Sequence, residues 1–123
     1  MAASVNDVVL DAALDIIAAS TLQIICNAEP TTRVEAVATY ALADVAMVAA
    51  DFTKANGDTS GRKVTMAAKY GIPIDANGNA THIALVDATR LLYVTTCVLK
   101  PLTLGEMIGI PTWKIELRDP TTV

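Results

Sequence analysis

The stretch TWKIELR (Thr112–Arg118) shows the fold class of this chain most directly. Its apolar residues Trp113, Ile115 and Leu117 occupy alternate positions, and charged residues stand between them. Successive side chains of a β-strand point to opposite faces, so this alternation is typical of an antiparallel strand with one buried face and one solvated face. The sequence therefore predicts a half-buried antiparallel strand in this part of the chain.

Short segments of similar character fill most of the chain before this strand, and turn signals separate them at the spacing of a β-sandwich. The expected extended segments are Leu22–Cys26, Ala46–Phe52, Arg62–Lys69, Gly71–Ile74, Ala80–Val86, Arg90–Leu99, Leu104–Ile108 and Thr112–Leu117. Asn77-Gly78 is expected to form a tight hairpin turn, which needs positive φ at both residues. Lys100-Pro101 is expected to end the longest strand.

Two other parts of the chain do not follow this strand pattern. Residues 33–50 are rich in alanine, which favours a helix, but also contain β-branched and aromatic residues, which favour a strand. This stretch is left open between the two, apart from the strand expected from Ala46. Residues 54–61 are expected to form an exposed loop or turn.

An amphipathic helix is expected near the start of the chain, over residues 4–19, with Ser4 or Asn6 as its cap. The apolar residues at helical spacing are Val9, Leu10, Ala13, Leu14, Ile16 and Ile17, and they form one face. The acidic residues Asp7, Asp11 and Asp15 recur on another face. That acidic stripe is either a solvated face or a docking edge for a basic partner.

Together these patterns predict a mainly β protein, an antiparallel β-sandwich of jelly-roll or Greek-key type with one N-terminal α-helix. No helices alternate with the strands, so a parallel α/β sheet is not expected. The length of 123 residues suits a single domain. That domain would comprise the helix at 4–19, the sandwich at 21–118 and a C-terminal tail at 119–123.

The charge and hydropathy of the chain bear on its partners. Nine basic against thirteen acidic residues give a net charge of −4, which disfavours nucleic-acid binding. No apolar run approaches the ~20 residues of a membrane helix, and the first residues lack the pattern of a secretory signal. The hydrophobic fraction of 53% suggests apolar surface that a homo-oligomer or larger assembly would cover. Alternatively, the many alanines raise that fraction without forming a patch.

Residues able to carry chemistry are few. His82 is the one histidine and has no partner at a useful spacing, so a structural or surface role is expected. The stretch Asp75–Asn79 resembles the start of a calcium loop, but its glycine comes too early and Val86 replaces the required glutamate. Cys26 and Cys97 are expected to be buried free thiols, and a disulfide between them is the alternative. No catalytic residue, cofactor or metal is predicted, and the chain is not expected to be an enzyme.

Several segments resemble a known family when taken as a set. They are Val9–Asp15, Leu22–Thr32, Asp58–Thr65, Gly78–Asp87 and Thr112–Pro120. In these segments the chain resembles a family of small virion structural proteins of tailed bacteriophages and prophages, and the likeness is weakest over residues 33–50. The resemblance implies synthesis in the cytoplasm of a bacterial host, a place in the virion, and virion proteins as partners.

The resemblance implies a place in the particle without specifying which one. The first expectation is a capsid decoration (cement) protein that contacts the major capsid protein. The alternative is a neck, collar or tail component. A further alternative, a host-receptor or glycan-binding module, requires a cluster of exposed aromatic side chains.

Contact residues for such an assembly are expected in two places, the N-terminal helix and the C-terminal end. They are Leu10, Leu14, Ile17, Trp113, Arg118 and Asp119. The helix residues have a second interpretation, in which they cover the core of the sandwich, as apolar stripes usually do. The tail would be either a free end or an arm on a neighbouring molecule.

Overall fold

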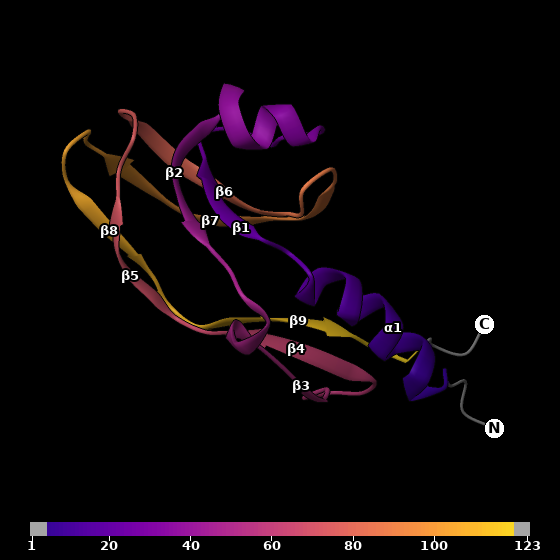
Figure 1. Ribbon diagram of the computed structural model, residues 1–123. Helices are drawn as coiled ribbons and strands as arrows, with labels where there is room; N and C mark the ends of the chain where they lie inside the picture. The colour runs from indigo at the N-terminus through magenta and orange to yellow at the C-terminus, as the bar shows by residue number, and fades with distance from the viewer. Residues whose placement is uncertain (1–4, 120–123) are drawn as a thin grey trace.

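A computed structural model describes residues 5–119 of the chain. The chain consists mainly of antiparallel β-strands with one helix at its start (Figure 1). The elements are α1 (Asp7–Ala18), β1 (Leu22–Cys26), the π-helical turn η1 (Glu35–Thr39), β2 (Ala41–Ala46), the 3-10 turn η2 (Ala49–Asp51), β3 (Phe52–Asn56), β4 (Arg62–Met66), β5 (Lys69–Pro73), β6 (Gly78–Val86), β7 (Leu91–Leu102), β8 (Met107–Ile110) and β9 (Trp113–Leu117).

The strands form two layers. The first layer is a four-stranded sheet in the order β2-β1-β6-β7. The second contains the sheets β3-β4-β9 and β5-β8, which continue one another because β4 leads into β5 and β8 leads into β9. Met66 pairs with Trp113, and Lys69 pairs with Ile110 shortly beyond. The mainly β, antiparallel, sandwich-like fold with one N-terminal helix is thus confirmed.

The main core lies between the two layers and has two parts. One part contains Ile25, Leu42, Ala43, Ile72, Ile74, Ala80, Leu102 and Ile110. The other contains Leu14, Met47, Val64, Met66, Leu85 and Ile115. Each large aliphatic side chain buried here contributes about 1.5–3 kcal/mol relative to an exposed one. The alternation seen in β9 has its predicted effect, since Ile115 is buried while its neighbour Lys114 is exposed.

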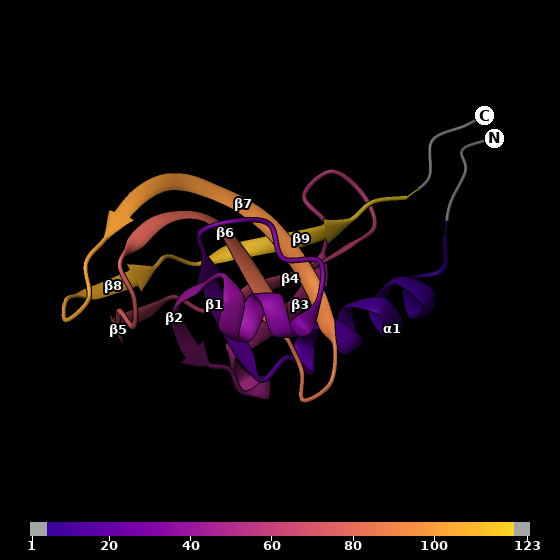
Figure 2. The ribbon, with the colours of Figure 1, turned by 90° about the horizontal axis from the view of Figure 1, so that it is seen from above.

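A smaller cluster covers the outer face of the first sheet. Ile24 and Cys26 of β1 lie there with Ala84 and Val86 of β6, beneath Ala36 of η1. The turn η1 lies over this face (Figure 2), which explains why β1 is apolar on both sides. Residues 33–50 therefore contain both expected kinds of structure, a helical turn and the strand β2.

Asn6, one of the two residues expected to cap the helix, is the N-cap of α1. The side chain of Asn6 accepts a hydrogen bond from the backbone N–H of Val8 at 2.9 Å, whereas Ser4 lies outside the described residues. The expected apolar face is only partly buried: Leu10 and Leu14 are buried, but Val9 and Ile16 are exposed. The reason is that α1 contacts β3, β4 and β7 along one side only.

The acidic stripe of the helix is partly paired within the chain. Asp11 accepts a hydrogen bond from Arg62 Nε at 2.8 Å, and Asp15 forms an ion pair with Lys54. Arg62 and Lys54 belong to β4 and β3, the strands on which the helix packs. This part of the stripe therefore helps to hold α1 on the second layer.

The expected strand Ala46–Phe52 is wrong. The chain leaves β2 at Ala46, makes the turn η2, and enters β3 at Phe52. Asp51 stabilises the turn by accepting a hydrogen bond from the Val48 N–H at 2.9 Å and by pairing with Lys69 at 2.9 Å. This turn carries the chain from the first layer to the second. Consequently, the first three residues of the loop expected at 54–61 belong to β3.

The expected hairpin at Asn77-Gly78 is also wrong. Within the described residues positive φ occurs only at Gly61, Gly71 and Gly105. The segment connects β5 in the second layer to β6 in the first, and Asn77 accepts a hydrogen bond from the Leu104 N–H at 2.7 Å. Tertiary contact rather than local turn geometry therefore decides its conformation.

The expected break at Lys100-Pro101 does not occur, since β7 continues to Leu102. Proline is tolerated there because β7 lies at the edge of its sheet and pairs only with β6.

Candidate contact surface

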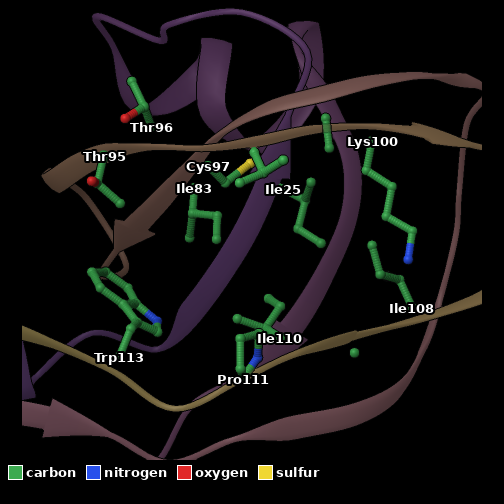
Figure 3. Close-up of a pocket in the computed structure, with 13 residues that line it drawn as sticks. Ile25, Ile83, Thr95, Thr96, Cys97, Lys100, Ile108, Ile110, Pro111 and Trp113 are labelled. Carbon is green, nitrogen blue, oxygen red and sulfur yellow. The ribbon is translucent and has the colours of Figure 1, made fainter.

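The sandwich is bridged along one side and open along the other. On the bridged side, Ala43 of β2 pairs with Ile74, just beyond β5. On the other side, β7 pairs with β6 and β8 pairs with β5, and no strand among residues 5–119 joins β7 to β8. We call the gap between residues 95–100 of β7 and residues 108–113 of β8 and β9 the open seam. It contains a cavity of about 440 Å³ (Figure 3).

The walls of this cavity are mainly apolar. Ile25 and Ile83 approach from the first layer, and Ile108, Ile110 and Trp113 approach from the second (Figure 3). Its volume falls within the ~300–1,000 Å³ that binding pockets usually occupy. The open seam is therefore large enough to receive a ligand or a side chain of another molecule.

Lys100 is the one charged residue among those that line the cavity. Its amino group points away from β7 toward Ile108, across the seam (Figure 3). Lys100 is exposed, and none of the ion pairs found within residues 5–119 involves it. An unpaired ammonium group beside apolar walls favours a binding partner that combines apolar groups with a carboxylate.

Trp113 forms one end of the cavity, and a hydrogen bond to a buried residue fixes the position of its ring. Its Nε1 donates a hydrogen bond to Oε1 of the fully buried Gln23 at 2.7 Å, and Gln23 Nε2 donates to the sulfur of Met47 at 3.9 Å. The rings of Trp113 and Tyr93 lie 6.0 Å apart between centroids. This predicted contact residue therefore connects the two layers and also lines the open seam.

A β-bulge in β7 exposes two adjacent apolar residues, Val98, which lines the cavity, and Leu99, which follows it in the chain, and we call this pair the apolar rim. Thr96 pairs with His82 and Lys100 with Ala80, so four steps along β7 match two along β6. Of the three intervening residues, Cys97 packs against the core, whereas Val98 and Leu99 are 91% and 59% exposed. Bulges commonly redirect side chains at sheet edges in this way.

The second layer also has exposed apolar residues. Leu104 is exposed before β8, Met107 is exposed at its first position, and Tyr70 is exposed on β5. The ring of Tyr70 lies against Gly109, where an added Cβ would come within 2.6 Å of it. These exposed residues were not predicted from the sequence, because apolar residues in strands were expected to face the core. The bulge that exposes Val98 and Leu99 has no local sequence signal.

The structure places the predicted helix contacts largely in the core. Leu14 has no exposed surface and Leu10 is 8% exposed, so neither offers a surface to another molecule. Their burial fits the second interpretation of the sequence, in which the apolar face of α1 covers the core of the sandwich. Ile17 is half-buried and packs against the same part of the core as Leu14.

The other two predicted C-terminal contacts, Arg118 and Asp119, lie away from the open seam. Arg118 is exposed and pairs with Glu116 at 2.7 Å. The backbone N–H of Asp119 donates to Ser60 Oγ at 3.0 Å, and its carboxylate accepts from the Val5 N–H at 3.5 Å. These contacts hold the start of the expected tail near α1, at the end of the molecule opposite β5 and β8 (Figure 2). Residues 120–123 of that tail lie outside the described residues.

The groups able to carry chemistry do not converge in the described part of the chain. His82 lies 2.8 Å from the Thr81 hydroxyl through Nδ1. Both cysteines are free thiols. Burial, and after it the nearby Cys97, raises the pKa of Cys26 to about 11, and burial also raises the pKa of Cys97. Both thiols are therefore protonated and weakly nucleophilic at neutral pH. Residues 5–119 contain no group of three or more His, Cys, Asp or Glu side chains arranged to hold a metal ion.

The open seam and its apolar rim thus form the strongest candidate for a functional surface.

Over the described range, no helix combines the length and apolar composition needed to span a bilayer. Comparison of the chain with protein-family models, with curated proteins and with solved structures finds no match.

Proposed function

We propose that this chain is a structural protein of a bacteriophage particle, and specifically a capsid decoration protein that binds the capsid exterior through protein–protein contacts. The observation that carries the proposal is the apolar rim of the open seam, above all Val98 and Leu99. The sequence resemblance to small virion proteins supports the assignment to a phage particle. No catalytic step is part of this proposal.

Apolar residues are exposed side by side in this protein, next to an apolar cavity. Single exposed apolar residues are ordinary, but adjacent ones beside an apolar cavity are typical of an interaction site. Burying such surface stabilises an assembly by roughly 25 cal/mol per Å². A decoration protein strengthens a capsid in this way, by adding buried surface between subunits.

The aromatic side chains favour protein contacts over glycan recognition. Among the five aromatic residues, all of which the structure describes, Tyr70 alone is exposed, whereas Tyr40, Phe52, Tyr93 and Trp113 are half-buried. A glycan-binding module was expected to require a cluster of exposed rings. The surface found here is mainly aliphatic, which suits a protein partner better.

The proposal is tested with particles of the phage or prophage that encodes the chain. Particles made without the gene are mixed with the purified chain, sedimented, and imaged by cryo-electron microscopy. The expected result is high-copy density on the capsid exterior and greater resistance of the capsid to heat. Density at the neck or tail in a few copies would replace decoration with the alternative virion role. Failure to bind or to occur in any particle would overturn the assignment.

A further inference from the structure

We propose that the open seam receives an extended segment of another virion protein. That segment pairs with the free edge of β7, inserts an apolar side chain into the cavity, and places a carboxylate beside Lys100. This inference deepens the proposed function and rests on it for the identity of the partner. It concerns the open seam alone.

The backbone is unpaired on both sides of the seam. In the structure of residues 5–119, β7 pairs on one side only and β8 pairs only with β5. Free strand edges are templates for an added strand. The bulge after Thr96 restricts regular pairing to the part of the edge before it, around residues 94–96.

The exposed apolar surface extends beyond the cavity. Ile83, Ile108 and Ile110 line the interior, whereas Val98 and Leu99 stand exposed at the rim. A small molecule confined to the cavity would leave the rim in water. A polypeptide that continues past the cavity covers both surfaces, so the exposed rim favours a polypeptide.

The charge of Lys100 also favours an acidic partner. Lys100 has no ion-pair partner among the described residues, and it is the one charged residue lining the cavity. An acidic residue in the bound segment would supply that partner. Because Lys100 is exposed, the pair is expected to change affinity modestly, by about three- to fivefold.

The test uses two capped hexapeptides, Thr-Ile-Thr-Ile-Thr-Asp and the same peptide ending in Lys, with decanoate as a small apolar carboxylate. Trp113 is the one tryptophan of the chain and lines the cavity, so its fluorescence reports occupancy. Hydrogen exchange of the full chain measures protection of β7. The Asp peptide is expected to bind about three- to fivefold more tightly than the Lys peptide and to protect residues 94–96.

Three variants locate the binding. Lys100→Glu should reverse the preference between the two peptides, and Val98→Asp should weaken both. Val8→Asp is the matched control, because Val8 is also an exposed valine, 74% accessible, but lies on α1. Circular dichroism verifies that each variant is folded.

The proposal is overturned if neither peptide binds, if Lys100→Glu leaves the preference unchanged, or if decanoate binds and the peptides do not. Loss of peptide binding with intact attachment to phage particles would remove the seam proposal and leave the virion role standing. Peptide binding without any particle attachment would support the seam and remove the virion role.

Discussion

At the scale of single residues, the pair Gln23 and Trp113 shows how the two layers are held in register. Gln23 is fully buried in an apolar strand, which is costly unless its polar atoms are paired. The Trp113 Nε1–H satisfies its carbonyl oxygen, and the Met47 sulfur accepts from its amide. No buried side-chain nitrogen or oxygen among the described residues lacks a hydrogen-bond partner.

Replacing Gln23→Leu should lower the free energy of unfolding by about 1–3 kcal/mol, because the Trp113 N–H then loses its acceptor. Urea denaturation followed by fluorescence measures the change. The double variant Gln23→Leu with Trp113→Phe, followed by circular dichroism, is the control for the hydrogen bond. It should cost less than the two single changes added together. Strict additivity would show that the hydrogen bond contributes nothing.

Asp44 predicts a pH dependence of stability. Burial, then a hydrogen bond and repulsion from Asp75, raises the pKa of Asp44 above its ordinary value of 3.8. A raised carboxyl pKa favours the folded state below the unfolded pKa, and that advantage is lost as the pH rises through the folded pKa. Asp44→Asn should therefore stabilise the protein at neutral pH relative to wild type, with the gain vanishing below pH 3.8.

Asp51 is the matched comparison, because its shift has the opposite sign. The hydrogen bond from the Val48 N–H, and then the one from Lys69, lowers the pKa of Asp51. Asp51→Asn should therefore destabilise the protein at neutral pH, and this loss should disappear as the pH falls through the folded pKa. Thermal unfolding of wild type and both variants across a pH series measures the two trends. Parallel curves for the two variants would contradict this account.

At the scale of elements, a helix or strand with one face on the core could be predicted from its sequence. The alternation in Thr112–Leu117 and the helical spacing of Leu10 and Leu14 both correspond to real elements with the expected buried residues. Segments whose conformation depends on distant contacts could not be predicted. The turn after Ala46 is stabilised by Asp51, which accepts a hydrogen bond from the Val48 N–H and forms an ion pair with Lys69. Lys69 lies eighteen positions after Asp51 in the sequence.

The helix α1 supplies a prediction that separates its buried face from its exposed one. Leu14 is fully buried, so Leu14→Ala should cost about 2–5 kcal/mol of unfolding free energy. Val9 is 60% exposed on the same helix, so Val9→Ala should change stability by no more than about 0.5 kcal/mol. Chemical denaturation of both variants tests this. Equal costs would mean that α1 does not pack through Leu14.

At the scale of the whole molecule, the open seam follows from how the two layers meet. Ala43 and Ile74 bridge one side, whereas on the other side the bulge in β7 displays Val98 and Leu99 beside the cavity. The composition correctly suggested exposed apolar surface, but its position depends on strand order and register, which single-chain patterns do not encode. The contact residues predicted near the C-terminal end therefore lie in two different places. Trp113 lines the seam, and Arg118 and Asp119 lie elsewhere.

This separation of core and rim predicts that attachment and stability respond to different substitutions. Val98→Asp and Leu99→Asp alter exposed side chains, so each should change the free energy of unfolding by no more than about 0.5 kcal/mol. Each should nevertheless abolish or strongly weaken sedimentation with particles, because a charge at the rim must be desolvated when the partner binds. Val8→Asp, an equally polar change on α1, should leave sedimentation intact. If Val98→Asp and Leu99→Asp sediment like wild type, the apolar rim is not the contact surface, and the attachment must use another face of the molecule.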